Sequence, residues 1–113
     1  MKKGTVIYKD NVICTAGIAD SYFLRLRGLV GRDVNELGSL WIKPCSQIHC
    51  CFMSYPIDVV YLDKNMVIVA IDRNVAPWRF RPSVRKARSV LEFAAGRADE
   101  YCLEIGQKMN VMR

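Results

Sequence analysis

The sequence is poor in the residues that build metal centres and disulfide frameworks. Its 113 residues include one histidine, His49, and five cysteines, an odd number that cannot all pair within one chain. Residues 45–51 offer soft ligands, but they lack the paired spacings of structural zinc sites, and no second histidine exists. We therefore expect no metal and no cofactor, and we expect the cysteines to be buried thiols of a reducing compartment.

Long apolar runs are also absent. No stretch approaches the roughly 20 residues that a membrane helix needs. Near the N-terminus, Lys9 and Asp10 interrupt the chain before an apolar signal-peptide core could form. We therefore predict a cytoplasmic protein without a membrane span. A content of 51% hydrophobic and 25% charged residues is typical of a folded domain, and the net charge of +6 favours anionic partners.

The residues that are present predict a mainly β fold. Tyr22, Leu26, Leu29 and Val30 are spaced as one apolar stripe of a helix. Turn residues separate short runs rich in β-branched side chains. Strands are expected at residues 5–8, 12–16, 40–42, 48–53, 57–62, 66–71, 90–93 and 108–112, with one or two helical turns at 98–103. We predict a single β-rich α+β domain over residues 1–113, a small antiparallel barrel or rolled sheet of about seven short strands with one flanking helix near residues 20–28.

Asp58 stands out because it lies in an apolar strand. Side chains alternate along residues 57–62, so Asp58 shares a face with Val60 and Leu62. Burying a lone carboxylate is costly unless a partner compensates it. Asp58 is therefore either a site residue paired with His49, Arg79 or backbone amides, or a structural residue that caps the turn at residues 55–56. The sequence leaves both roles open.

His49 and Glu92 are the other isolated polar groups. His49 has the only side chain whose ordinary pKa lies near neutrality, so a pair with Asp58 would suit acid–base chemistry. Cys51 shares its strand face, but a separation of about 6.5 Å is long for proton transfer. No catalytic residue is assigned, and the sequence does not decide whether the protein is an enzyme. Glu92, placed between apolar neighbours, would need a cation such as Arg79 or Arg32.

A basic segment lies between residues 73 and 88 and contains no acidic residue. Its basic residues are Arg73, Arg79, Arg81, Arg85, Lys86 and Arg88. Trp78 and Phe80 alternate with two of the arginines, a pattern that suits stacking on single-stranded nucleic acid. A solvated loop with Trp78 packed inward explains the same pattern, and no RNA-recognition signature accompanies it.

Several blocks together resemble the DUF192 family, in particular the subgroup with His-x3-Met-x2-Pro-Ile-Asp and Pro-Trp-Arg motifs. The resemblance runs from Leu24 to Val111. Cys50 stands where close relatives carry threonine, and Val30 stands where methionine is usual. The matching blocks are residues 27–32 (Arg-Gly-Leu-Val-Gly-Arg), His49 with Met53, 56–63 (Pro-Ile-Asp-Val-Val-Tyr-Leu-Asp), 76–79 (Ala-Pro-Trp-Arg) and 90–96 (Val-Leu-Glu-Phe-Ala-Ala-Gly). The resemblance implies a bacterial-type protein with a mainly β fold and a set of positions, but no reaction.

The leading hypothesis is a non-enzymatic binding or accessory module whose polar site takes a small anionic ligand or a segment of a protein partner. His49, Asp58, Trp78 and Arg79 would form that site. The full set of ligand-binding candidates is His49, Met53, Asp58, Trp78, Arg79 and Glu92. The alternatives are nucleic-acid binding through the basic segment and a hydrolytic or thiol enzyme that uses His49 and Asp58. The oligomeric state is left open.

Overall fold

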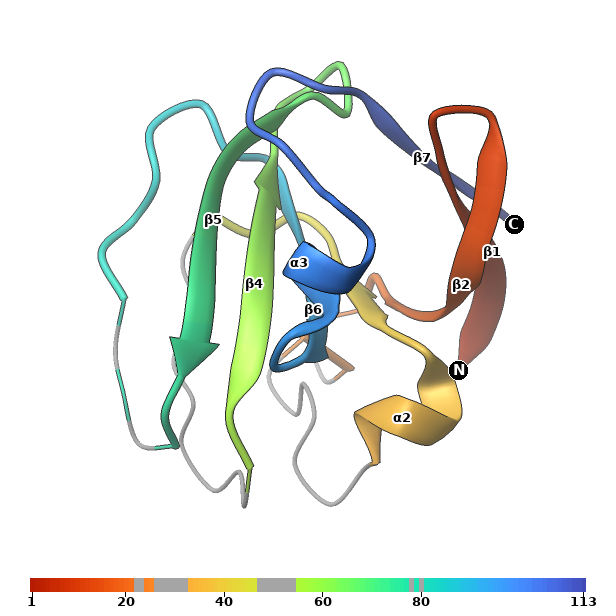
Figure 1. Cartoon of the computed structure of the whole chain (residues 1–113), viewed down its shortest axis with the longest axis horizontal. Helices are drawn as coiled ribbons and strands as arrows, with labels where there is room; N and C mark the ends of the chain where they lie inside the picture. The colour runs from red at the N-terminus through yellow and green to blue at the C-terminus, as the bar shows by residue number, and fades with distance from the viewer. Residues whose placement is uncertain (22–23, 26–32, 47–54, 78, 80) are drawn as a thin grey trace.

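The described part of the chain contains one curled sheet of seven strands. The strand order is β5-β4-β6-β3-β2-β1-β7. The computed structural model describes residues 1–21, 24–25, 33–46, 55–77, 79 and 81–113. In Figure 1 the sheet bends into a half-barrel, with β4 and β5 on one side and β1, β2 and β7 on the other. The strands are β1 (Lys2–Tyr8), β2 (Asn11–Ala19), β3 (Leu40–Ile42), β4 (Ile57–Leu62), β5 (Ile68–Val75), β6 (Ser89–Ala94) and β7 (Met109–Met112). The predicted mainly β class is confirmed.

The sheet departs from the predicted antiparallel pairing at one place. β2 and β3 run parallel, with Gly17 opposite Leu40, whereas every other strand pair of this sheet is antiparallel. Parallel neighbours need a crossover of a dozen or more residues, and residues 20–39 provide it. The predicted helix near residues 20–28 and the predicted strand at 48–53 lie mostly or wholly outside the described residues.

Two cores lie on opposite faces of the sheet. The inner core lies inside the curl, because it takes residues from both sides of the half-barrel: Val6, Tyr8, Ala16, Ile18, Trp41, Val60, Leu62, Ile68, Leu91, Phe93, Ala98, Leu103, Met109 and Val111. The outer core covers the other face of β3, β4 and β6: Ala19, Val34, Leu40, Ile42, Ile57, Val59, Tyr61, Val75, Ala87 and Val90. The alternation predicted along residues 57–62 is confirmed by this division.

Two short helices are described, α2 (Val34–Leu37) and α3 (Arg97–Glu100). The Asp33 side chain caps α2 by accepting a hydrogen bond from the Asn35 amide, and Gly38 ends that helix at a φ of 83°. α3 follows Gly96, and its residue Ala98 is buried in the inner core. α3 corresponds to the helical turns predicted at 98–103, while α2 has no counterpart in the prediction. No helix within the described residues is long and apolar enough to span a membrane.

Candidate functional site

Half of the predicted ligand-binding residues can be placed. His49, Met53 and Trp78 lie outside the described residues, so the predicted gathering around them stays a prediction. Asp58 lies on β4, Glu92 on β6, and exposed Arg79 follows β5. Within the described residues no ion pair joins Arg79 to Asp58 or to Glu92.

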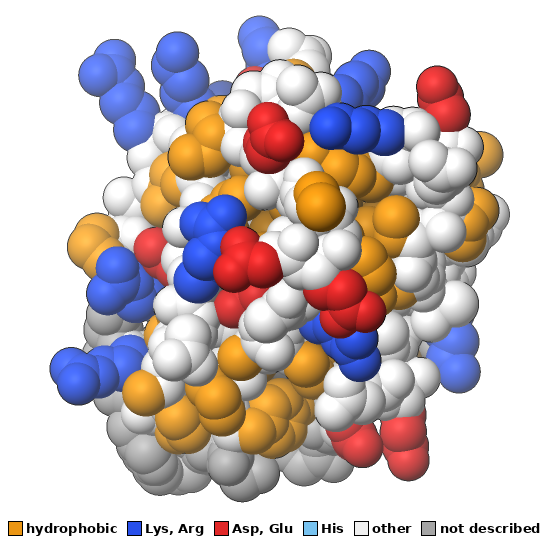
Figure 2. All heavy atoms as spheres, in the orientation of Figure 1, with side chains coloured by type: hydrophobic (Ala, Val, Ile, Leu, Met, Phe, Trp, Pro, Cys, Tyr) orange, Lys and Arg blue, Asp and Glu red, His pale blue; other side chains and the backbone are white. Residues whose placement is uncertain are grey.

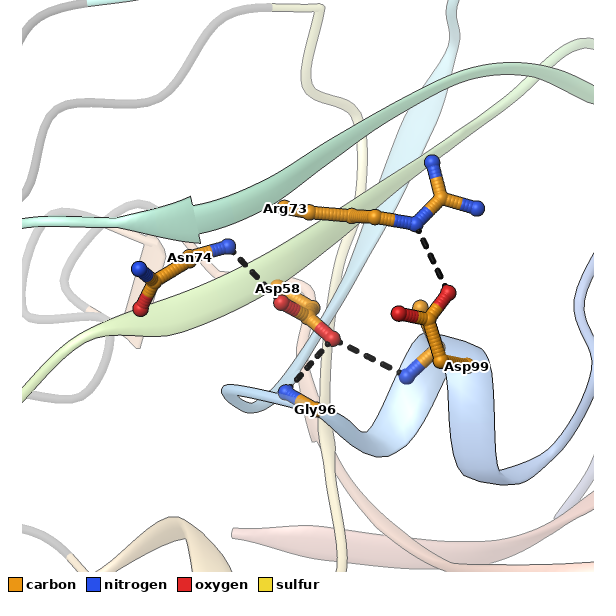
Figure 3. A network of polar contacts seen from close by, with 6 residues as sticks. Asp58, Arg73, Asn74, Gly96 and Asp99 are labelled. Carbon is orange, nitrogen blue, oxygen red and sulfur yellow. Dashed lines mark hydrogen bonds and ion pairs between the residues drawn. The ribbon is translucent and has the colours of Figure 1, made fainter.

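Asp58 is 1% exposed and is held by three backbone amides. Its Oδ1 accepts a hydrogen bond from the Asn74 amide at 2.9 Å. Its Oδ2 accepts from the amides of Gly96 and Ala98, both at 3.0 Å. Figure 3 shows the carboxylate between the end of β5 and the start of α3. A buried carboxylate is tolerable here because three donors compensate its desolvation.

These hydrogen bonds tie together segments that are remote in sequence. Asn74 has a φ of 52° and Gly96 a φ of 94°, so both chain segments turn sharply where they meet Asp58. Of the partners considered for Asp58, backbone amides are the ones that the described residues supply. The three donors lie 16 to 40 residues away in sequence, so these hydrogen bonds do not cap the turn at residues 55–56.

Glu92 is 4% exposed and lies on the outer-core face. Its neighbours across the sheet are Leu40 and Val59, both apolar. Among the described residues no hydrogen bond or ion pair reaches its carboxyl group. Burial therefore raises the pKa of Glu92 to about 7. The Tyr55 phenol is close enough for its own pKa, raised mainly by burial, to be raised further by Asp33 and Glu92.

A second polar network, not predicted from the sequence, links Tyr61, Asp72 and Arg81. The buried Tyr61 hydroxyl donates to Asp72 Oδ2 at 2.9 Å. Arg81 Nε donates to the same oxygen at 3.2 Å, and its Nη2 donates to Oδ1 at 3.4 Å. Burial and the adjacent carboxylate raise the pKa of Tyr61 well above its usual value. The register of the β4–β5 hairpin is the signal that could have indicated this network. Asp72 is paired with Val59 and therefore lies diagonally across from Tyr61.

The basic segment is partly neutralised by acids from outside it. Arg73 pairs with Asp99 at 3.0 Å, and Arg81 pairs with Asp72. In the orientation of Figure 1, Figure 2 shows acidic side chains beside basic ones near the centre of the visible face, while basic side chains at its upper edge project outward. The remaining basic residues are exposed and form no ion pair in the described part of the chain: Arg79, Arg85, Lys86 and Arg88.

Comparison with known proteins now adds to this geometry. The family model DUF192, described as "Uncharacterized ACR", matches residues 5–111. The chain belongs to the DUF192 family. A "UPF0127 protein" of Thermococcus sibiricus is 33% identical over 98 residues, which cover 82% of this chain and 63% of the relative, less than two thirds of its length. A UPF0127 protein of Pyrococcus horikoshii is 31% identical over 97 residues, covering 81% of this chain and 83% of the relative.

Two crystal structures share the DUF192 fold of this chain. One, "a protein of unknown function" from Novosphingobium aromaticivorans, matches with a TM-score of 0.81 and 16% identity, over 95% of this chain and 83% of that one. The other, "a putative transcription regulator" from Sinorhizobium meliloti, matches with a TM-score of 0.83 and 18% identity, over 97% of this chain and 94% of that one. Identities this low establish the fold alone. No specific function is established for the family.

The thiols of this DUF192 domain fit the sequence expectations only in part. Cys14 and Cys45 are half-buried, but Cys102 is exposed, so the expectation of buried thiols is wrong there. Burial raises the pKa of the Cys14 thiol, against smaller lowering effects of Ser39 and Arg97. The described residues contain no cluster of three or more His, Cys, Asp or Glu side chains that could hold a metal ion.

Proposed function

We propose that this DUF192 domain is a non-enzymatic binding module for a small anionic ligand or for a carboxylate-bearing segment of a partner. The observation that carries the proposal is the contrast between Asp58 and Arg79. Asp58 is buried and occupied by three amides. Arg79 is exposed and has no ion pair within the described residues. A planar guanidinium in that state suits two-pronged binding of a carboxylate.

In this proposal Asp58 holds the backbone of the site in place, and Arg79 binds the ligand. A general acid or base must reach the proton that it transfers, and a carboxylate that is 1% exposed cannot reach a substrate from solvent. Asp58 instead fixes the end of β5, from which the chain continues to Arg79. His49 and Trp78 would complete the site as an orienting group and a wall. Met53 and Glu92 stay further candidates.

Calorimetric titration tests the proposal with succinate and inorganic phosphate as probes. Arg79→Ala should weaken binding at least about tenfold, which equals a loss of about 1.4 kcal/mol. Arg85→Ala is the matched control, because it removes the same charge from another exposed position of the segment. Equal weakening by both substitutions would mean that only the overall charge matters. Absence of binding by the unmodified chain to either probe would refute this form of the proposal.

Nucleic-acid binding is the second candidate, supported by the four exposed cations without ion pairs. The structural neighbour from Sinorhizobium meliloti is described as "a putative transcription regulator". Binding of a single-stranded oligonucleotide through about four phosphates should weaken with salt at a logarithmic slope near −3. A flat salt dependence would leave the small-ligand proposal in place.

A further inference from the structure

A pocket of about 490 Å³ lies at the opposite end of β4 and β6 from the Asp58 network. Asp63, which follows β4, and Ser89, which begins β6, both line it. Asp58, by contrast, is near the start of β4 and contacts Gly96 beyond the end of β6. The pocket is therefore separate from the region of Arg79 and Asp58. Its volume is in the range of small-molecule sites, about 300 to 1,000 Å³.

The walls of the pocket combine an apolar surface with free positive charge. Trp41, Pro44 and Met66 supply the apolar part. The cations are Lys43, Lys64 and Arg88, none of which forms an ion pair within the described residues. The Lys43 ammonium lies 4.4 Å from the centroid of the Trp41 ring, so the cation and the aromatic wall are adjacent.

The two acids of the lining are already engaged elsewhere. Asp20 pairs with Lys2 at 3.4 Å and with Arg113 at 3.5 Å. Asp63 Oδ1 accepts hydrogen bonds from the backbone amides of Asn65 and Val67 at 2.8 and 3.0 Å. Neither carboxylate forms an ion pair with a cation of the pocket. With three cations against two acids, the lining has a net charge of one positive.

The indole N–H of Trp41 is not part of the pocket surface. Trp41 is 7% exposed, and its Nε1–H is buried without an acceptor in the described part of the chain. Buried donors are almost always paired, so an orphaned one calls for an explanation. The Trp41 N–H has no accessible surface, so its missing acceptor belongs inside the fold, and Trp41 lines the pocket through other atoms.

We propose that this pocket binds a small organic monocarboxylate with an apolar body. The carboxylate would be held by Lys64 and Arg88 beside Lys43, and the apolar body would lie against Trp41 and Met66. A single negative charge matches the net charge of the lining, whereas a polyphosphate would meet the two acids. The apolar wall requires more than a bare anion, because acetate leaves that wall exposed to water.

The two tryptophans of the chain allow a direct test. In a Trp78→Phe variant, Trp41 is the only remaining indole fluorophore. Phenylacetate is the probe, phenylacetamide is its uncharged analogue, and acetate lacks the apolar body. We expect a saturable change in Trp41 emission with phenylacetate, and binding at least about tenfold weaker for both comparison compounds. Equal binding of phenylacetate and phenylacetamide would overturn the proposal, as would no saturable change at millimolar phenylacetate.

A matched pair of substitutions locates the binding. Lys64→Gln removes a cation of the pocket, and Lys86→Gln removes an exposed lysine that does not line it. Only Lys64→Gln should weaken phenylacetate binding, by about tenfold; equal weakening by both would overturn the proposal. Calorimetry on the unmodified chain makes the same comparison without altering Trp78. Phenylacetate could instead change the emission of Trp78 in a Trp41→Phe variant but not the emission of Trp41 in the Trp78→Phe variant. That result would overturn binding in this pocket and would leave the Arg79 site as the binding site.

Discussion

Asp58 and Glu92 lie on adjacent strands of the sheet, yet their carboxyl groups face opposite cores. Glu92 is directly opposite Val59, the residue after Asp58, so the two side chains project from opposite faces. Asp58 accepts three amide hydrogen bonds. No described residue donates to Glu92, whose pKa burial raises to about 7. The two buried acids therefore cannot act as a catalytic carboxylate pair, and they should respond differently to mutation and to pH.

Replacement of Asp58 should destabilise the fold strongly. Asp58→Ala leaves the amides of Asn74, Gly96 and Ala98 without their acceptor, at a cost of about 3 kcal/mol or more. Urea unfolding measures this loss, and hydrogen exchange at the three amides should speed up. Asp99→Asn is the control, because its ion pair with Arg73 is exposed and contributes less than about 1 kcal/mol. Similar losses for both variants would contradict the structural role of Asp58.

Glu92 should make the protein less stable as pH rises from about 4.5 to 7. Its carboxyl group has a pKa of about 7 in the folded state, above the ordinary value of 4.5, so the folded state binds more protons in that window. Ionisation above pH 7 therefore carries a penalty on the order of 3 kcal/mol relative to pH 4. Glu92→Gln should remove that slope from a plot of unfolding free energy against pH. An unchanged slope in the variant would show that Glu92 ionises normally.

The Tyr61 hydroxyl should contribute measurably through Asp72. Tyr61→Phe removes a buried hydrogen bond of 2.9 Å and should lower the free energy of unfolding by about 1 kcal/mol. A double-mutant cycle with Asp72→Asn isolates the pairwise energy. Asp72 keeps Arg81 as a partner in the Tyr61→Phe variant, so the fold should persist. Additive effects of the two substitutions would mean that the two side chains do not interact in solution.

Alkylation rates should separate the cysteines. Exposed Cys102 should react quickly at neutral pH, whereas half-buried Cys14, whose thiol pKa is raised, should react at least about tenfold more slowly. Timed labelling with iodoacetamide and peptide mass spectrometry assigns each rate. The thiol-enzyme alternative instead requires the fastest labelling at Cys50 or Cys51, next to His49. Labelling at Cys50 or Cys51 that outpaces Cys102 would revive that alternative.

Local sequence patterns could be predicted from this sequence, whereas pairing between segments distant in sequence could not. The strand expected at 57–62 is β4 (Ile57–Leu62), and its two faces divide as the alternation of Asp58 and Val59 predicts. Periodicity alone, however, carries no information on which distant amides would surround Asp58. The same limit applies to the parallel pairing of β2 and β3, which depends on the path of the crossover rather than on either strand.

The pairing of β1 with β7 has a consequence for how the chain folds. Thr5 lies opposite Met112, so one edge of β1 is covered only by the strand that is farthest from it in sequence. Until β7 has been synthesised, that edge presents unpaired amides and carbonyls to other chains. Contacts of such large sequence separation also slow folding. Deletion of β7 should thus promote intermolecular strand pairing and aggregation, because it opens this edge and also removes Met109 and Val111 from the inner core.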